Sequence, residues 1–176
     1  MKLKIVEYPD RRLKLKSDKI ELFDDNLHKL LDAMNEIMIN SNGIGLAAIQ
    51  VNHPKQALIL NIPLEDGEQL PENLIEIINP TIVSKDGETS YQEGCLSVPG
   101  FYEDIKRYEN VTIEYQDRDG NDKVLEANGL LSIAIQHEID HLNGILFIDK
   151  LSYSRRKKFE KEYKQLQKER KRKSKN

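Results

Sequence analysis

The stretch Ser132–Gly144, SIAIQHEIDHLNG, places two histidines four residues apart in an otherwise apolar segment. Apolar residues occupy nearly every side of this segment and Asn143-Gly144 supplies a stop signal, so the pattern predicts a buried helix. In such a helix His137, Glu138 and His141 are costly unless each finds a partner. The fold is therefore expected to close around a central helix that carries polar groups.

The two histidines have the spacing of metal ligands. On a helix, residues four apart lie on one face with Cβ atoms about 5–6 Å apart, so both imidazoles can reach one cation at roughly 2.0–2.1 Å. Glu138 lies one position further round the helix, where a general base for metal-activated water is expected. The competing interpretation is a chance HExxH pattern on an ordinary helix.

A third metal ligand would distinguish these interpretations. The longer metzincin pattern expects a histidine six residues after His141, but that position is Phe147. Glu160 or Glu162 could serve, as in another protease class, although both lie in a strongly basic segment. Cys95, the lone cysteine, is by itself more often a small buried hydrophobe. Beside a two-histidine site we favour it, because a thiolate is a strong ligand for zinc or ferrous iron.

The remaining periodicities predict an α+β fold. The predicted elements are a helix at 24–40, strands at 56–63 and 74–84, a hairpin at 110–127 and a charged helix at about 154–173. Asp24 or Asp25 can cap the first helix, and Asp119-Gly120 provides the hairpin turn. We expect antiparallel strands folded around the central buried helix that carries HExxH, with a C-terminal helix added.

Charge divides the chain into two parts. Its 176 residues suffice for one domain with a sizeable core. Residues 151–176 hold 12 Lys/Arg and 3 Asp/Glu, whereas the preceding 150 residues hold 15 and 27. We therefore predict a metal-dependent catalytic domain at 1–150 and a basic C-terminal helical tail at 151–176.

Composition and the N-terminal residues predict a cytoplasmic protein. A single cysteine excludes a disulfide within the chain and fits a reducing compartment. No apolar run approaches the roughly 18 residues of a membrane span. The start, MKLKIVEYPDRR, lacks a secretory apolar region and the look of a transit peptide. We expect no membrane partner and no DNA partner.

Three segments together resemble the peptide deformylase family, whose patterns are GxGxAAxQ, EGCLS and QHExDHxxG. They stand here as GIGLAAIQ (43–50), EGCLS (93–97) and QHEIDHLNG (136–144), in that order, and the resemblance covers residues 1 to about 150. It implies that Cys95, His137 and His141 bind the metal, with water as the fourth ligand.

The resemblance also implies catalytic roles and an activity. Glu138 would act as general base and then acid, while the Gln50 amide and the Leu96 N–H would hold the oxyanion. The family removes the formyl group from the N-terminal formyl-methionine of nascent proteins and releases formate. Its metal is expected to be Fe²⁺, with Zn²⁺, Ni²⁺ or Co²⁺ as alternatives. The competing functions are a zinc peptidase that cleaves internal bonds and a small protein with a closed structural zinc site.

The glycine-rich segment could simply end the first helix and pack, or it could form an extended edge that pairs with substrate backbone. The resemblance favours the second interpretation, with apolar side chains around a methionine pocket. The predicted substrate-binding residues are Gly43, Ile44, Gly45, Tyr91, Glu93, Gly94, Leu130 and Ile133. By the same resemblance Arg107 would pair with Glu93 and brace the metal loop.

The basic tail has two interpretations. It is either a solvated surface helix or a contact for ribosomal RNA, since nascent chains emerge from a polyanion and phosphate contacts favour Lys and Arg. The expected partners are formyl-methionyl nascent peptides and, through the tail, the ribosome.

Overall fold

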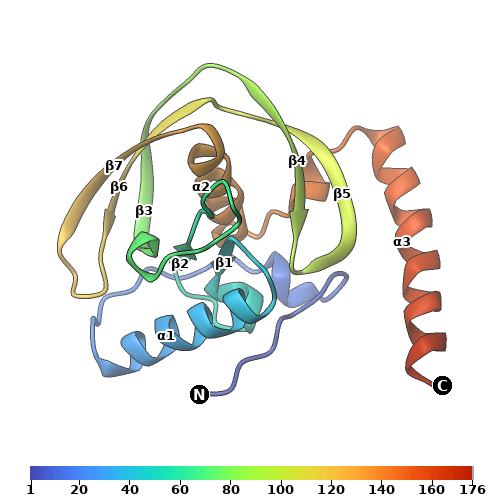
Figure 1. Cartoon of the computed structure of the whole chain (residues 1–176), viewed down its shortest axis with the longest axis horizontal. Coiled ribbons are helices and arrows are strands. Elements are labelled where there is room, and N and C mark those ends of the chain that lie inside the picture. The colour runs from blue at the N-terminus through green and yellow to red at the C-terminus, as the bar shows by residue number, and fades with distance from the viewer. Residues whose placement is uncertain (176) are drawn as a thin grey trace.

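The computed structural model describes residues 1–175, and its strands arch over a central helix (Figure 1). The helices are α1 (Asp25–Asn40), α2 (Gly129–Leu142) and α3 (Tyr153–Ser174). The strands are β1 (Gly45–Ala47), β2 (Ala57–Leu60), β3 (Ile75–Asp86), β4 (Thr89–Cys95), β5 (Val98–Arg107), β6 (Asn110–Gln116) and β7 (Asp122–Asn128). The α+β class expected from the sequence is confirmed.

Antiparallel pairing builds two sheets around α2. The larger sheet has the order β1-β2-β3-β6-β7, and β4 pairs with β5 in a separate ribbon. In Figure 1 the larger sheet rises on one side of α2 and the ribbon on the other. The central helix thus lies between two walls of strands, and its polar face is shielded from bulk water.

Helix α1 begins and ends where the sequence predicts. The Asp24 carboxylate accepts a hydrogen bond of 3.1 Å from the Leu27 N–H, which satisfies one free donor of the first turn. After the helix, Asn42 has a positive φ of 59°, a conformation that asparagine tolerates. The apolar face packs under the larger sheet through Leu27, Leu30, Leu31, Met34 and Met38, all buried.

The ribbon β4–β5 is an element that the sequence patterns did not indicate. It pairs Tyr91 with Ile105 and Glu93 with Glu103, and the chain reverses between Cys95 and Val98. Only Glu93 among the first five residues of β4 is buried, so an apolar alternation is missing from that strand. The reversal places Cys95 directly beside α2.

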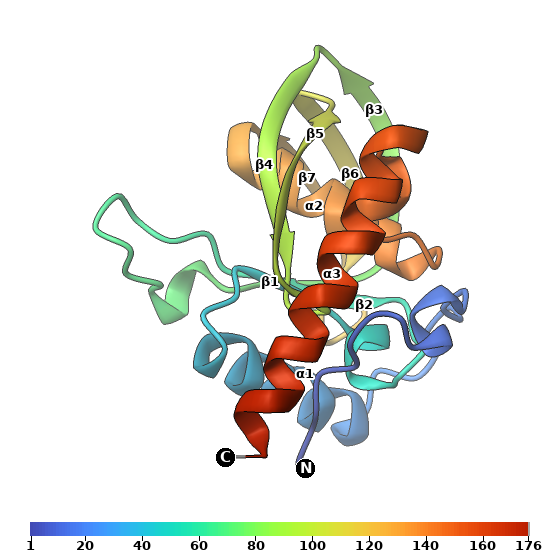
Figure 2. The same cartoon turned by 90° about the vertical axis from the view of Figure 1, so that its right-hand side faces the viewer.

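The C-terminal helix α3 packs by its first half. Phe159 and Tyr163 are 0% and 4% exposed and join a core cluster with Val98. In Figure 1 and Figure 2 α3 lies beside the ribbon, and its second half contacts the N-terminal segment through the Arg170–Glu7 ion pair at 3.2 Å. Within residues 1–175 none of the helices combines the length and apolarity required to cross a membrane.

The N-terminal segment is tied to the loops beneath α2. The Val6 N–H donates a 2.7 Å hydrogen bond to the Gln50 carbonyl, and the Tyr8 N–H donates a 2.7 Å hydrogen bond to the Ser97 carbonyl. These bonds connect the first residues of the chain to two segments that carry predicted catalytic groups.

Candidate metal centre

Two elements bring three potential metal ligands together. Helix α2 supplies His137 and His141, and the end of β4 supplies Cys95. The two histidine Nε2 atoms lie 3.2 Å apart, and the Cys95 Sγ lies 3.4 Å from the His141 Nε2. All three ligand atoms lie within 4.8 Å of one another. The lone thiol and the histidine pair, 42 or more residues apart in sequence, therefore converge on one point.

The geometry of this cluster fits a divalent cation. A tetrahedral ion with metal–nitrogen distances of about 2.0–2.1 Å places two ligand nitrogens roughly 3.4 Å apart, close to the observed spacing. The Glu93 carboxylate accepts a 2.8 Å hydrogen bond from the His137 Nδ1–H, which directs the Nε2 atom of His137 toward the cluster. Among residues 1–175 the group of possible ligands comprises Cys95, His137 and His141, so an ion held there keeps an open coordination position.

A buried charge network holds His137 in this orientation. The Arg107 guanidinium donates hydrogen bonds of 2.7 and 2.8 Å to Glu93 and one of 2.7 Å to Asp140. Burial raises the pKa of Glu93, but the hydrogen bonds from Arg107 and His137 outweigh burial, so that pKa lies below its ordinary value. Glu93 is therefore an ionised carboxylate that accepts a hydrogen bond from the His137 N–H. The structure places Arg107 at Glu93, as the resemblance implied.

The pKa values of His137 and His141 are shifted in opposite directions. Burial lowers the pKa of His137, but hydrogen bonds with Cys95 and Glu93 outweigh it and hold that pKa well above its ordinary value. Burial and the positive charges of His137 and Arg107 hold the pKa of His141 well below its ordinary value. A cation must therefore displace a proton from His137 but finds His141 already neutral.

Glu138 is the free carboxylate of the site. Burial raises its pKa to about 7, near the pH at which a group that both accepts and returns a proton works best. One oxygen lies 3.8 Å from the His137 Nε2, and the other has no hydrogen-bond partner among the described residues. A buried carboxylate with an unused oxygen is unusual away from functional sites.

The Gln50 amide is fixed next to the cysteine. Its Oε1 accepts a 2.9 Å hydrogen bond from the Ala47 N–H, which turns the amide nitrogen toward the cluster. That nitrogen lies 3.0 Å from the Ser97 Oγ and 3.4 Å from the Cys95 Sγ. Gln50 is 1% exposed, so its orientation is held by the protein. Gln50 and Leu96, the latter in the reversal between β4 and β5, line the same cavity.

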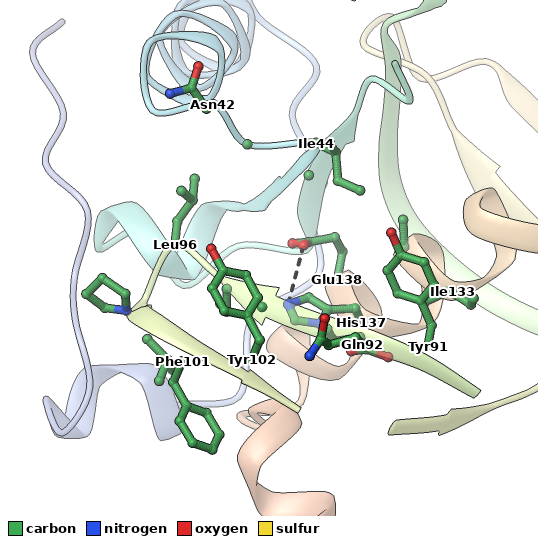
Figure 3. Close-up of a pocket in the computed structure, with 18 of the residues that line it drawn as sticks. Asn42, Ile44, Tyr91, Gln92, Leu96, Phe101, Tyr102, Ile133, His137 and Glu138 are labelled. Atoms are coloured by element: carbon green, nitrogen blue, oxygen red, sulfur yellow. Dashed lines mark hydrogen bonds and ion pairs between the residues drawn. The ribbon is translucent and has the colours of Figure 1, made fainter. Parts of the chain in front are cut away.

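A cavity of about 520 Å³ opens beside the cluster. Figure 3 shows His137 and Glu138 at its base, with Ile44, Tyr91 and Ile133 on one side and Leu96 and Tyr102 on the other. The structure places all of the predicted substrate-binding residues in its wall: Gly43, Ile44, Gly45, Tyr91, Glu93, Gly94, Leu130 and Ile133. Their contact with a substrate stays a prediction.

Several wall residues escaped the sequence analysis. Tyr102 is 64% exposed, and its ring lies over Gly94, where an added Cβ would come within 2.5 Å of the ring. Phe101 and Gln92 line the same cavity. All three belong to the ribbon β4–β5, which the sequence patterns did not indicate, so their position could not be derived.

The alternative third ligands lie elsewhere. Glu160 pairs with Arg156 at 3.3 Å and with Lys157 at 3.7 Å, and Glu162 pairs with Lys158 at 3.9 Å, all on α3. These carboxylates are part of a charged helix surface, and neither belongs to the ligand cluster.

A thiol and two imidazoles with an open position, next to a buried carboxylate that can exchange a proton, define the site of a metal-dependent hydrolase. Comparison with known proteins identifies the kind of hydrolase. The family model for polypeptide deformylase matches residues 2–157.

Relatives and solved structures agree with this match. A peptide deformylase of Helicobacter pylori (strain HPAG1) is 58% identical over 171 residues, which cover 97% of this chain and 98% of that protein. A crystal structure of a peptide deformylase from Legionella pneumophila superposes with a TM-score of 0.90 at 37% identity, covering 98% and 99% of the two chains. A crystal structure of peptide deformylase from Ehrlichia chaffeensis in complex with actinonin gives a TM-score of 0.84 at 41% identity, covering 93% and 97%.

The chain therefore belongs to the peptide deformylase family. It is an enzyme, a metal-dependent hydrolase that acts on a formyl-peptide amide. The family resemblance and the reaction class expected from the sequence are both confirmed.

Proposed function

We propose that the chain removes the formyl group from formyl-methionyl nascent polypeptides and releases formate, with Cys95, His137 and His141 holding one divalent metal ion. The observation that carries the proposal is the convergence of these ligand atoms at the base of a cavity, beside Glu138. The ion would supply a Lewis acid that makes water nucleophilic near neutral pH and stabilises negative charge on the formyl oxygen.

The residues around the metal ligands would transfer protons, stabilise the oxyanion and orient His137. Glu138 takes a proton from the attacking water and later gives it to the amine nitrogen of methionine, which its pKa of about 7 suits. The Gln50 amide and the Leu96 N–H donate hydrogen bonds to the formyl oxygen as it gains charge. Glu93 and Arg107 keep His137 oriented.

The cavity wall would bind the peptide. Gly43, Ile44 and Gly45, which lead into β1, would offer backbone groups to the substrate backbone, and the apolar wall would accept the methionine side chain. Support for this assignment comes from the wall itself, in which Tyr91 and Ile133 stand across the cavity from Leu96 (Figure 3). Glu93, Gly94 and Leu130 complete the wall.

Formate release tests the proposed function. A coupled assay should detect formate from a formyl-methionyl tripeptide but no acetate from the acetylated tripeptide, and actinonin should inhibit the reaction. A chelator should abolish formate release, and an added divalent metal should restore it. Cleavage of internal bonds in an unformylated peptide, without formate release, would favour the zinc peptidase instead.

For the native metal we propose Fe²⁺. One thiolate and two imidazoles accept either ferrous iron or zinc, so donor chemistry alone does not choose, and the resemblance to deformylases favours iron. Metal analysis of protein purified anaerobically should find iron at about one ion per chain, as the three-ligand site requires. Zinc in that preparation would contradict the assignment, and nickel or cobalt should replace iron with activity retained.

We further propose that residues 1–150 carry the catalytic machinery in the cytoplasm, a location that the lone cysteine supports. Residues 151–176 would form a basic tail that contacts ribosomal RNA. Residue 176 lies outside the described residues. Of the eleven Lys/Arg residues of α3, five lie between 168 and 173, where the helix is exposed, and these support the contact.

Removing the whole tail would not test the ribosome contact cleanly, because Phe159 and Tyr163 are core residues. Substitution of the exposed Lys168, Lys171, Arg172 and Lys173 by glutamine leaves that packing intact. Salt-sensitive co-sedimentation with ribosomes should then weaken, while hydrolysis of a formyl tripeptide stays unchanged. Unaltered co-sedimentation would leave the tail as a solvated surface helix.

A further inference from the structure

The Gly43–Gly45 edge, proposed above to pair with the substrate backbone, has few side chains of its own that could hold it in place. Of the residues Gly43–Gly45, Gly45 alone lies in a strand, the three-residue β1, which among residues 1–175 is an edge strand that pairs with β2. Gly43 and Gly45 carry no side chains that could anchor the segment in a core, and glycine gives the backbone extra freedom. Hydrogen bonds from neighbouring segments must therefore fix the position of this edge.

The edge also lies very close to catalytic groups. A Cβ added at Gly45 would lie 3.0 Å from the Glu138 Oε1, and one added at Gly43 would lie 2.8 Å from the Leu96 Cδ1. The backbone of the edge thus packs directly against the proposed base and the proposed oxyanion loop. A small displacement would change the space between the edge and both groups.

The connection between β2 and β3 holds the edge through hydrogen bonds. The Gln69 Nε2 donates one bond of 2.9 Å to the Gly43 carbonyl and another of 2.8 Å to the Asn61 carbonyl. The Asn61 N–H in turn donates a 2.8 Å bond to the Ile44 carbonyl, and the Asn61 side-chain amide donates a 2.9 Å bond to the Leu70 carbonyl. Residues 61–70 therefore form a clasp on residues 43–44.

Gln69 is the side chain on which this clasp depends. It is half-buried and uses both amide hydrogens on backbone carbonyls, one in the edge and one in the clasp. A carboxylate at this position could not donate either bond and would face two carbonyl oxygens instead. The other hydrogen bonds to the edge join backbone groups: Asn61 N–H to the Ile44 carbonyl, Gly43 N–H to the Met38 carbonyl at 2.9 Å, and the β1–β2 pairing at Gly45. Gln69 is therefore the part that substitution can remove.

We propose that Gln69 is a positioning residue for substrate binding, which holds the Gly43–Gly45 edge in place through the Gly43 carbonyl. The inference rests on the proposed function, in which that edge pairs with the peptide backbone. Gln69 itself does not line the cavity, and it acts through the backbone that does. Its effect should grow with the length of peptide that the edge can bind.

The test compares Gln69→Ala and Gln69→Glu with Glu68→Gln, a matched control on an exposed neighbour in the same connection. Each variant is assayed with its metal on formyl-methionine amide and on a formyl-methionyl tripeptide. For the tripeptide we expect KM to rise about three- to tenfold in both Gln69 variants, the effect of one neutral hydrogen bond, with little change in kcat. For formyl-methionine amide, KM should change by less than about twofold in every variant. The Glu68→Gln variant should likewise change KM by less than about twofold on either substrate.

Metal content and the midpoint of thermal unfolding, measured on the same preparations, separate positioning from general damage. Metal content should match the unsubstituted protein, because the clasp does not touch the metal ligands, and the midpoint of thermal unfolding should fall by only about 2–4 °C in the Gln69 variants. Unchanged tripeptide KM, or an equal loss on both substrates together with lost metal, would overturn the inference while the unsubstituted protein still releases formate. Failure of the unsubstituted protein to release formate would overturn the proposed function, and this inference with it.

Discussion

Replacing Arg107 with alanine removes the cation that holds two carboxylates beside the histidine pair. Its side chain is 3% exposed and makes hydrogen bonds of 2.7 and 2.8 Å to Glu93 and 2.7 Å to Asp140. Removing one partner of a buried ion pair leaves an uncompensated charge, which typically costs about 3–5 kcal/mol. We expect the free energy of unfolding of the metal-free protein to decrease by an amount in this range.

The same substitution should weaken metal binding. Glu93 accepts the His137 Nδ1 proton at 2.8 Å, and Arg107 holds that carboxylate in place. Loss of such support typically lowers metal affinity about 10- to 100-fold. Competition with a chelator measures the affinity, and urea unfolding of the metal-free protein measures stability.

A double variant separates the two effects. Glu93→Gln combined with Arg107→Met removes both buried charges, and Asp140 keeps Lys150 at 3.5 Å as a partner. We expect most of the free energy of unfolding to return. Metal affinity should stay low, because a neutral amide is a weaker acceptor than a carboxylate for the His137 N–H.

Arg12→Ala is the control, because Arg12 pairs with Asp10 at the surface with a side chain 49% exposed. It should leave the free energy of unfolding almost unchanged, because solvent screens an exposed pair. The reasoning is refuted if Arg107→Ala destabilises the protein no more than this control and binds metal as tightly as the unsubstituted protein.

Other residues give simpler expectations. Gln50→Ala should keep the metal but lower kcat about 10²- to 10³-fold, through loss of an oxyanion donor. Glu138→Gln should also keep the metal and lower kcat about 10²- to 10⁴-fold, through loss of proton transfer. Phe159→Ala should cost about 3–5 kcal/mol of unfolding free energy in urea, because the ring is fully buried. Apparent metal affinity should fall as pH falls, because the raised pKa of His137 makes protons compete for the ligand.

Each expectation has an outcome that contradicts it. If Gln50→Ala or Glu138→Gln keeps activity near that of the unsubstituted protein, the substituted residue has no part in the mechanism. If the variant loses its metal, the residue has a structural role instead. Phe159→Ala should be compared with Tyr153→Ala at an 80% exposed position of α3, and equal stability of the two would show that α3 packs loosely. A metal affinity that does not change with pH would mean that His137 binds no competing proton.

The sequence predicted the elements whose patterns are local. Asp24, the apolar spacing after it and the stop near Asn42 were enough to place α1, and HExxH in an apolar segment was enough to place α2. The ribbon β4–β5 was not predictable in this way. Its inward positions include Glu93 and Arg107, which are buried because they pair with each other, and no periodicity of apolar residues reports such a pairing.

The site shows the same division. The ligands and Glu138 could be proposed from motif spacing and resemblance, whereas Tyr102 and Gln69 could not. Tyr102 of β5 reaches the cavity because the unpredicted pairing of β5 with β4 brings its ring over Gly94. Gln69 reaches Gly43 from 26 residues away through a long connection whose path no local rule determines. Contacts of this kind depend on tertiary structure.

The hydrogen bonds of Val6 and Tyr8 have a practical consequence for anyone who modifies the chain. They anchor the carbonyl of Gln50 and the carbonyl of Ser97, so the N-terminal residues support two segments that border the candidate metal centre. A protease that clipped the first eight residues would leave both carbonyls without these donors. Affinity tags are better attached where Met1, 67% exposed, already projects into solvent than inserted nearer to Val6.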